Sequence, residues 1–425
     1  MKRKLAAAIV IAGMMVSVSA CGGDDDDSGK NAGPDSFKGQ TLTVWAMDGS
    51  TPDQWVKDVT AAFEKKTGAK LKFETQKWDG IQQKITTALS ESTPPDVLEV
   101  GNTQTPAYAA TGGLADLSDL KKEIGTDWTP SVSQSSVYDG KQYAAPWYFA
   151  NRVVIYNKKI WAKAGIKDTP KTRDEFFKDL QAIDKKTDAE PIYLPGQNWY
   201  FFDGLIIGQG GDLVKKDGDK YVSNLGDPKV AKAMEIYAKY ASYSKAPKDK
   251  DEATPQQAEV FAKGKTGAII GMGWEAGTAV TANKAIEKDL GYFTIPGETA
   301  AKPEGVFLGG SNLAVAQGSK KQALAKEFLK IALSDQYEGE LAKLNGVIPN
   351  KQALESNLKG NVVAEAAAPG AAVGGTTPLI PEWGAVENSP NPIKSYMTAV
   401  LNGKSPADAA KQVEGEINKR LAQQN

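Results

Sequence analysis

The spacing of apolar residues along the chain alternates between the periods typical of strands and of helices. In the first hundred residues, strands are predicted at 41–46, 70–75 and 96–100, and helices at 51–67 and 80–91. A strand–helix–strand–helix–strand order of this kind favours an α/β fold, in which a mostly parallel sheet carries helices on both faces.

The same alternation returns in the middle and at the end of the chain. Residues 153–156 and 266–270 are apolar enough for buried strands, and Thr172, Asp227 and Ser405 are placed to cap the starts of amphipathic helices. A chain of 425 residues is too long for one ordinary domain, so the pattern predicts two lobes.

The N-terminal segment has the features of a secretion signal. A basic start and an apolar run too short to span a membrane precede Cys21. The small residues before this cysteine resemble the lipobox of bacterial lipoproteins, which implies that Cys21 receives a diacylglyceryl group and becomes the new N-terminus. Residues 1–20 are therefore predicted to be a lipoprotein signal peptide, and residues 21–38 the lipidated cysteine with a flexible acidic tether. We expect the protein to be lipid-anchored at the extracytoplasmic face of the bacterial cell membrane.

The composition narrows the available chemistry. Histidine is absent and Cys21 is the only cysteine, so neither a catalytic triad with histidine nor a zinc site of the usual ligands can be built. The formal net charge of −1 gives no general attraction to nucleic acid. The segment 264–266 reads Gly-Lys-Thr but lacks the earlier glycine of a phosphate-binding loop, because that position is Glu259. The sequence therefore predicts no metal, no cofactor and no enzymatic activity.

Nine tryptophans are the most informative feature. Trp55 and Trp161 fall within helical patterns, which predicts core or helix-surface positions, and Trp128 lies in a loop. The others follow strands or lie in turns rich in glycine or proline, namely Trp45, Trp78, Trp147, Trp199, Trp274 and Trp383. Ligands of an open α/β sheet bind beyond the carboxyl ends of its strands, so this set predicts a shared aromatic-lined cleft. Sugars suit such a cleft because their C–H faces stack on aromatic rings.

Several short segments carry a resemblance to a known family. They are residues 95–100, 110–117, 138–146, 155–158, 261–268 and 323–329. In this order, behind a lipobox, they are similar to the maltose-binding-protein-like group of extracellular solute-binding proteins, which serve carbohydrate ABC importers. The resemblance extends over residues 41–421.

The resemblance implies a two-lobed periplasmic-binding-protein-like fold with the ligand cleft between the lobes. Each lobe is expected to be a mostly parallel sheet flanked by helices. Lobe 1 would comprise residues 39–149 and 311–351, and lobe 2 residues 150–310 and 352–425. Binding would then drive closure about a hinge, and the permease would recognise the closed form.

The resemblance also implies that the loops facing the cleft hold the ligand, with Asp48 as a hydrogen-bond acceptor. Maltose-type proteins carry a carboxylate where this chain has Ala150, so maltose specificity is not implied and Asn151 or Arg152 would take over that role. Together with Trp78 and Trp147 from the aromatic set, the expected ligand-binding residues are Asp48, Gly49, Asn102, Thr103, Gln104, Asn151, Arg152, Asn198, Trp199, Tyr200, Trp274, Glu275, Gly310, Ser311, Asn312 and Trp383.

The expected function is that of a substrate-binding lipoprotein of an ABC importer. As a monomer, it would capture a monosaccharide, a disaccharide or a short oligosaccharide and deliver it to separate permease subunits in the membrane. Two alternatives stay open. In the first, the ligand of the cleft is another small solute, such as a polyamine, iron or a peptide. In the second, the protein is a secreted carbohydrate-active enzyme with a pair of carboxylates.

Overall fold

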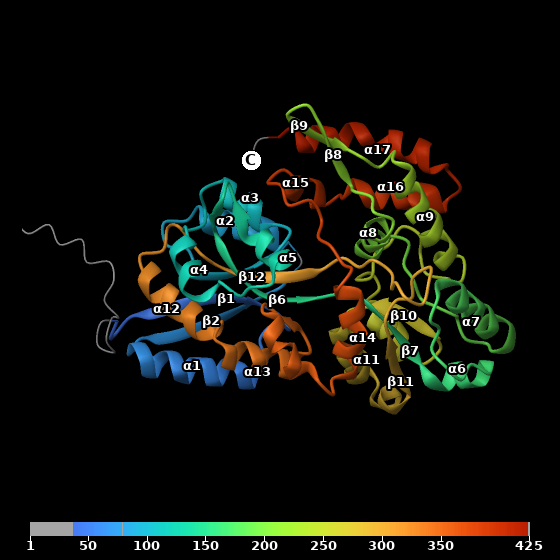
Figure 1. Cartoon of the computed structure of the whole chain (residues 1–425), viewed down its shortest axis with the longest axis horizontal. Helices are drawn as coiled ribbons and strands as arrows, with labels where there is room; N and C mark the ends of the chain where they lie inside the picture. Colours follow the sequence, from blue (N-terminus) through green and yellow to red (C-terminus); the bar gives the residue numbers. More distant parts are fainter. Residues whose placement is uncertain (1–36, 79, 424–425) are drawn as a thin grey trace, which may run out of the picture.

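The computed structural model describes residues 37–78 and 80–423. The predicted signal peptide, the lipidation site at Cys21 and most of the predicted tether lie outside these residues. The described chain forms two lobes that lie side by side (Figure 1). Within that range, no helix combines the length and the apolar character needed to cross a membrane.

The first lobe is built on a six-stranded sheet with the strand order β13-β6-β12-β3-β1-β2. Its strands are β1 (Thr41–Met47), β2 (Lys70–Gln76), β3 (Val97–Gly101), β6 (Ala144–Ala150), β12 (Gly309–Val315) and β13 (Ile348–Pro349). Because β1 runs parallel to β2 and β3, the carboxyl ends of these three strands lie at one edge. At the same edge β6 leaves for the second lobe and β12 returns from it, since β12 is antiparallel to both β3 and β6.

Helices cover both faces of this sheet (Figure 1). They are α1 (Asp53–Thr67), α2 (Ile81–Leu89), α3 (Thr105–Ala110), α4 (Ser118–Ile124), α5 (Pro130–Ser133), α12 (Gln322–Ala332) and α13 (Asp335–Asn345), with the 3₁₀ turns η1 (Gln134–Ser136) and η3 (Gln352–Leu358) and a hairpin of β4 (Val137–Tyr138) and β5 (Lys141–Gln142). As the apolar spacing predicts, α1 buries Trp55, Val59 and Phe63. It ends at Gly68, whose φ of 69° is a left-handed conformation that glycine adopts without a steric penalty.

The second lobe has a smaller sheet with the order β10-β7-β11. Its strands are β7 (Val153–Asn157), β10 (Ala268–Gly271) and β11 (Leu290–Phe293), and a hairpin of β8 (Val214–Asp217) and β9 (Lys220–Ser223) lies apart from them. The helices of this lobe are α6 (Lys158–Ala164), α7 (Arg173–Lys186), α8 (Trp199–Gly208), α9 (Pro228–Ala241), α10 (Gln257–Ala262), α11 (Gly273–Ala282), η2 (Lys284–Asp289), α14 (Val362–Ala371), α15 (Trp383–Glu387), α16 (Pro392–Leu401) and α17 (Pro406–Leu421).

The predicted proportion of parallel pairing is wrong. In the first sheet β1 pairs in parallel with β2 and β3, but the pairings of β12 and β13 are antiparallel. In the second sheet β7 is antiparallel to both neighbours, and the parallel bridge of β10 is to an isolated residue, Tyr193. The reason is the path of the chain. In the first sheet, helix crossovers place the early strands in parallel, whereas β12 comes back from the other lobe and enters the sheet in the opposite direction.

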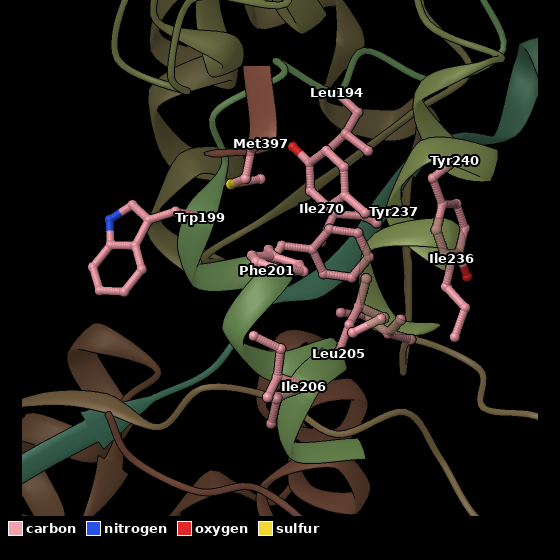
Figure 2. Close-up of a cluster of buried hydrophobic side chains, with 14 of the residues drawn as sticks. Leu194, Trp199, Phe201, Leu205, Ile206, Ile236, Tyr237, Tyr240, Ile270 and Met397 are labelled. Carbon is pink, nitrogen blue, oxygen red and sulfur yellow. The ribbon is translucent and has the colours of Figure 1, made fainter. Parts of the chain in front are cut away.

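The largest hydrophobic cluster holds the second lobe together and fixes α8. Phe201 of α8 packs against Tyr237 and Tyr240 of α9, with ring centroids 5.7 and 5.6 Å apart. Each such side chain contributes about 1.5–3 kcal/mol when fully buried. Figure 2 shows Phe201 and Leu205 pointing into this cluster, and Trp199 at the start of the same helix is a further member, 5% exposed, at its border. The core therefore positions the N-terminal turn of α8 at the surface that faces the first lobe.

Candidate ligand-binding cleft

A cleft of about 420 Å³ lies between the two lobes. Its volume is within the range of small-molecule sites. Gln82 and Gln104 line it from the first lobe. The second lobe supplies Gln197, Trp199, Tyr200, Asp249, Lys250, Asp251, Thr254, Glu387, Ser389, Pro390, Asn391, Lys394 and Ser395.

The aromatic wall of the cleft is the first turn of α8. The rings of Trp199 and Tyr200 have centroids 4.0 Å apart. Tyr200 also stacks on Phe307, at 4.4 Å and an interplanar angle of 16°, and the Arg152 guanidinium lies 5.4 Å from the Tyr200 centroid. These neighbours fix Tyr200 and take up its faces, so its edge and hydroxyl are the parts left for a ligand.

The opposite wall of the cleft is polar. Lys394 of α16 pairs with Asp251 at 2.6 Å, and the side chain of Asn391 caps α16 by accepting the Ile393 amide at 2.9 Å. The described residues contain no group of three or more His, Cys, Asp or Glu placed to hold a metal ion. The cations of the lining are paired, since Lys250 also lies 3.9 Å from Asp249. Amides, hydroxyls and ion pairs beside an aromatic wall suit an uncharged ligand rich in hydroxyl groups.

The two lobes touch directly at the rim of the cleft, where α15 meets the first lobe (Figure 1). The Thr103 hydroxyl donates to the Glu387 carboxylate at 2.8 Å, and the Gln82 amide donates to the Gly384 carbonyl at 3.1 Å. A Cβ added to Gly384 would lie 3.0 Å from the Gln82 amide nitrogen and 3.4 Å from Cβ of Ala107. The absence of a side chain at Gly384 therefore allows α15 to approach the first lobe this closely.

Burial raises the pKa values of several carboxyl groups of the second lobe, three of them to about 7 or 8. Desolvation raises the pKa of Glu387 to about 7, although hydrogen bonds to its carboxylate oppose the shift. Desolvation, reinforced by the negative charge of Glu387, raises the pKa of Asp203 on α8 to about 8. Burial also raises the pKa of Glu275 to about 7. In the folded protein, Asp203 therefore holds its proton at neutral pH.

We expect the free energy of unfolding to fall as the pH rises from about 5 to about 8. In this window folded Asp203 keeps a proton that the unfolded chain, with a carboxyl pKa of about 3.9, has lost. Each carboxyl group with a raised pKa therefore lowers the free energy of unfolding by up to about 1.4 kcal/mol per pH unit. In Asp203→Asn this slope should be smaller when urea unfolding is measured at several pH values. Asp217→Asn, at an exposed site on β8, is the control. An unchanged slope in Asp203→Asn would contradict the assignment.

A family model described as bacterial extracellular solute-binding protein matches residues 48–339. The chain belongs to this family. It is 76% identical over 424 residues to the diacetylchitobiose binding protein DasA of Streptomyces coelicolor, and the match covers 100% of both chains. It is 26% identical to a maltooligosaccharide ABC transporter solute-binding lipoprotein of Streptococcus pneumoniae, over 80% of this chain and 79% of the relative.

Solved structures place this solute-binding protein in the same fold. The GacH receptor of Streptomyces glaucescens matches with a TM-score of 0.77 and 24% identity, over 90% of this chain and 98% of the receptor. A cyclo/maltodextrin-binding protein complexed with maltotetraose matches with a TM-score of 0.74 and 22% identity, over 90% and 97% of the two chains. These likenesses confirm the predicted two-lobed fold.

The solute-binding protein brings part of the predicted site to the cleft. Gln104, Trp199 and Tyr200 line it, and Thr103 contacts its wall through Glu387. By contrast, Asp48 and Gly49 form an exposed turn after β1 and are not among the lining residues.

Trp78 and Trp274 are the two exposed tryptophans among the described residues, at 45% and 54%. Trp78 follows β2 and lies beside the cleft, since a Cβ added to Gly101 would be 3.7 Å from both its ring and the Gln104 side chain. Trp274 lies shortly after β10 in the chain. The last residue of β10, Gly271, pairs with Val153, which is the first residue of β7 after the chain has crossed from the first lobe. Both rings therefore stand at the ends of the sheets that face the other lobe.

Trp147 and Trp383 are buried, each 1% exposed, and neither lines the cleft. Trp147 lies on β6, a strand whose sheet is covered by helices on both faces, and packs against Trp55 with centroids 5.5 Å apart. Trp383 opens α15 and turns inward, with its ring 6.5 Å from that of Trp199. Glycine and proline around a tryptophan mark a turn but do not determine where the side chain points.

Other predicted ligand contacts are already bonded within the protein. Asn198 caps α8 by accepting the Phe201 amide at 3.3 Å. A side chain on Gly310 would collide with β6, so this glycine serves close strand packing. The remaining pairs are Asn102 with the Leu308 carbonyl at 2.9 Å, Asn151 with the Ala367 carbonyl at 3.2 Å, Arg152 with Glu252 at 2.5 Å, Ser311 with Glu99 at 2.6 Å, Asn312 with Thr105 at 2.9 Å, and Glu275 with the Met272 amide at 2.7 Å.

Sequence reasoning missed most of the polar wall. The missed lining residues are Gln82, Gln197, Asp249, Lys250, Asp251, Thr254, Glu387, Ser389, Pro390, Asn391, Lys394 and Ser395. The one local signal was the Ser-Pro-Asn-Pro run at 389–392, which predicts a capped helix start and so an anchored loop. The polar residues of α16 are spaced like those of any solvent-exposed helix face, and nothing in the sequence distinguishes them.

Proposed function

We propose that this solute-binding protein captures diacetylchitobiose and delivers it to the permease of an ABC importer. The observation that carries the proposal is the 76% identity to the diacetylchitobiose binding protein of Streptomyces coelicolor. Because that match covers 100% of both chains, it includes both lobes and the cleft between them.

The chemistry of the cleft supports a disaccharide of this kind. Each of its sugar rings carries an apolar C–H face, hydroxyl groups and an acetamido group. Trp199 provides aromatic surface, and the amides of Gln82 and Gln104 provide both donors and acceptors. We assign Trp78 and Trp274 as the aromatic residues that stack on the sugar from opposite lobes, since both are exposed at facing sheet ends.

Closure is proposed to use the crossings predicted near residues 150 and 310, and a third crossing that lies after η3 and not at residue 352, because η3 packs on α13 of the first lobe. The support is the path of the chain, because β6 of the first sheet ends at Ala150 and β7 of the second begins at Val153. Sugar that contacts both walls would stabilise the closed arrangement, and separate permease subunits would recognise it. The protein is proposed to act as a monomer and by binding alone, without changing the sugar chemically.

The test is calorimetric titration of the purified protein with diacetylchitobiose. Cellobiose is the matched control, because it keeps the two linked rings and replaces each acetamido group by a hydroxyl. We expect diacetylchitobiose to bind at least about tenfold more tightly, a difference of about 1.4 kcal/mol. Equal affinities, or no binding of diacetylchitobiose, would refute the assignment. Mass spectrometry after long incubation should recover the intact disaccharide, and release of smaller sugars would favour the enzyme alternative.

The protein is proposed to be held at the extracytoplasmic face of the membrane by lipid on Cys21. In Cys21→Ala, label from a fatty-acid probe fed to the cells should be absent, because the acyl chains have no thiol to bind. Ser28→Ala, seven positions further along the predicted tether, should be labelled like the wild type. Equal label on Cys21→Ala would overturn the anchor.

A further inference from the structure

A second groove adjoins the cleft on its outer side and has a volume of about 620 Å³. It shares Gln197 and Ser395 with the cleft, so the two spaces border the same residues. Its lining consists of Gln197, Ser395, Thr398, Ala399, Asn402, Gly403, Lys404 and Gln412.

One face of α16 runs through both spaces. The helix buries Ile393, Tyr396 and Met397 on the side that packs into the core. The opposite side presents a stripe at helical spacing, of which the first part lines the cleft and the last part lines the groove. The residues of this stripe, in chain order, are Asn391, Lys394, Ser395, Thr398, Ala399 and Asn402.

A side-chain hydrogen bond lies at the border between the two spaces. Gln197 donates from its amide to the Thr398 hydroxyl at 3.0 Å. Beyond it, the half-buried Ala399 forms a small floor that leaves room above the helix. A chain that leaves the cleft past Gln197 therefore enters the groove along α16.

The groove is chemically suited to an uncharged polar group. None of its lining residues is a carboxylate, and the Lys404 ammonium donates to the Gln412 amide oxygen at 2.6 Å. Hydroxyls and amides remain as donors and acceptors, at Ser395, Thr398 and Asn402. No aromatic ring lines the groove, so it offers hydrogen bonds without stacking.

We propose that this groove is a second binding site, which holds the third sugar of an acetylated oligosaccharide whose first two sugars occupy the cleft. The inference rests on the proposed function of the cleft. It makes the protein a receptor for chains longer than the disaccharide, with the additional sugar bound through its hydroxyl and acetamido groups along α16.

The experiment fills the groove and leaves the cleft unchanged. Ala399→Arg places a long side chain on the groove floor, at a residue that lines the groove and not the cleft. Ala407→Arg is the matched control, at an exposed position in the first turn of α17 outside both linings. Each protein is titrated with diacetylchitobiose and with triacetylchitotriose. Asn402→Arg, at an exposed lining residue, is a second variant in case Ala399→Arg does not fold.

The expected result is a loss that depends on ligand length. Ala399→Arg and Asn402→Arg should weaken binding of the trisaccharide by about tenfold or more and leave the disaccharide within about twofold, while Ala407→Arg changes neither. Equal effects on both sugars, or no effect on either, would overturn the second site. So would a wild-type protein that binds the disaccharide but not the trisaccharide, and in that case the proposed function stands. Failure of the wild type to bind the disaccharide would refute the proposed function itself.

Discussion

Trp383→Ala is expected to lower the free energy of unfolding by about 3–5 kcal/mol, since truncating a buried aromatic residue removes apolar contacts and leaves a cavity. The Trp383 side chain is 1% exposed and belongs to the large cluster of the second lobe. Because it is enclosed by protein, we expect the fraction that remains folded to bind sugar with little change.

Urea unfolding of the ligand-free protein measures this loss, and calorimetric titration below the transition measures binding. Trp55→Ala is a positive control in the other lobe, where the indole is 1% exposed and donates to the Tyr337 carbonyl at 2.8 Å. If Trp383→Ala unfolds like the wild type but loses sugar binding, Trp383 belongs to the binding site after all.

Trp274→Ala and Trp78→Ala should have the opposite signature. Each is expected to weaken diacetylchitobiose binding by about 1–3 kcal/mol, because the sugar loses an aromatic partner. Neither should change the unfolding transition much, since the two side chains are 54% and 45% exposed and fill no space in a core.

The matched controls are Trp274→Phe and Trp78→Phe, which keep an aromatic face and should retain most of the affinity. Titration calorimetry and thermal unfolding of the same preparations separate binding from stability. Normal affinity in both alanine variants would remove these residues from the site and leave Trp199 as the aromatic surface of the cleft.

The elements that the sequence predicts well are those fixed by local chemistry. Thr172 and Glu175 form the predicted capping box at the start of α7, with hydrogen bonds of 3.2 and 3.3 Å between side chains and backbone amides. The apolar stripe of α1 likewise faces the core, because helical spacing determines which residues share a side. Such features need only neighbours within one or two turns.

The cleft depends on contacts between residues far apart in the chain, which local patterns do not encode. Trp199 and Trp383 each open a helix and are each buried, yet Trp199 lines the cleft and Trp383 does not, depending on how α8 and α15 pack. The prediction of mostly parallel strands was wrong for the same reason. The return of β12 from the other lobe depends on the path of the whole chain, which local patterns do not encode. The resemblance supplied the fold, whereas the individual contacts required the packed structure.

If the lobes close as proposed, the hydrogen bonds of α15 to the first lobe favour the closed arrangement. Two such bonds, from Thr103 and Gln82, stabilise the closed rim by about 1–3 kcal/mol before any sugar arrives. A larger closed fraction raises the apparent affinity, because less of the binding free energy is used to bring the lobes together. It also has a drawback, since an empty receptor that closes by itself has the shape of a loaded one and competes with it for the permease. A stronger rim contact would therefore improve the capture of sugar from dilute solution, but it would also increase unproductive docking of the empty protein to the permease.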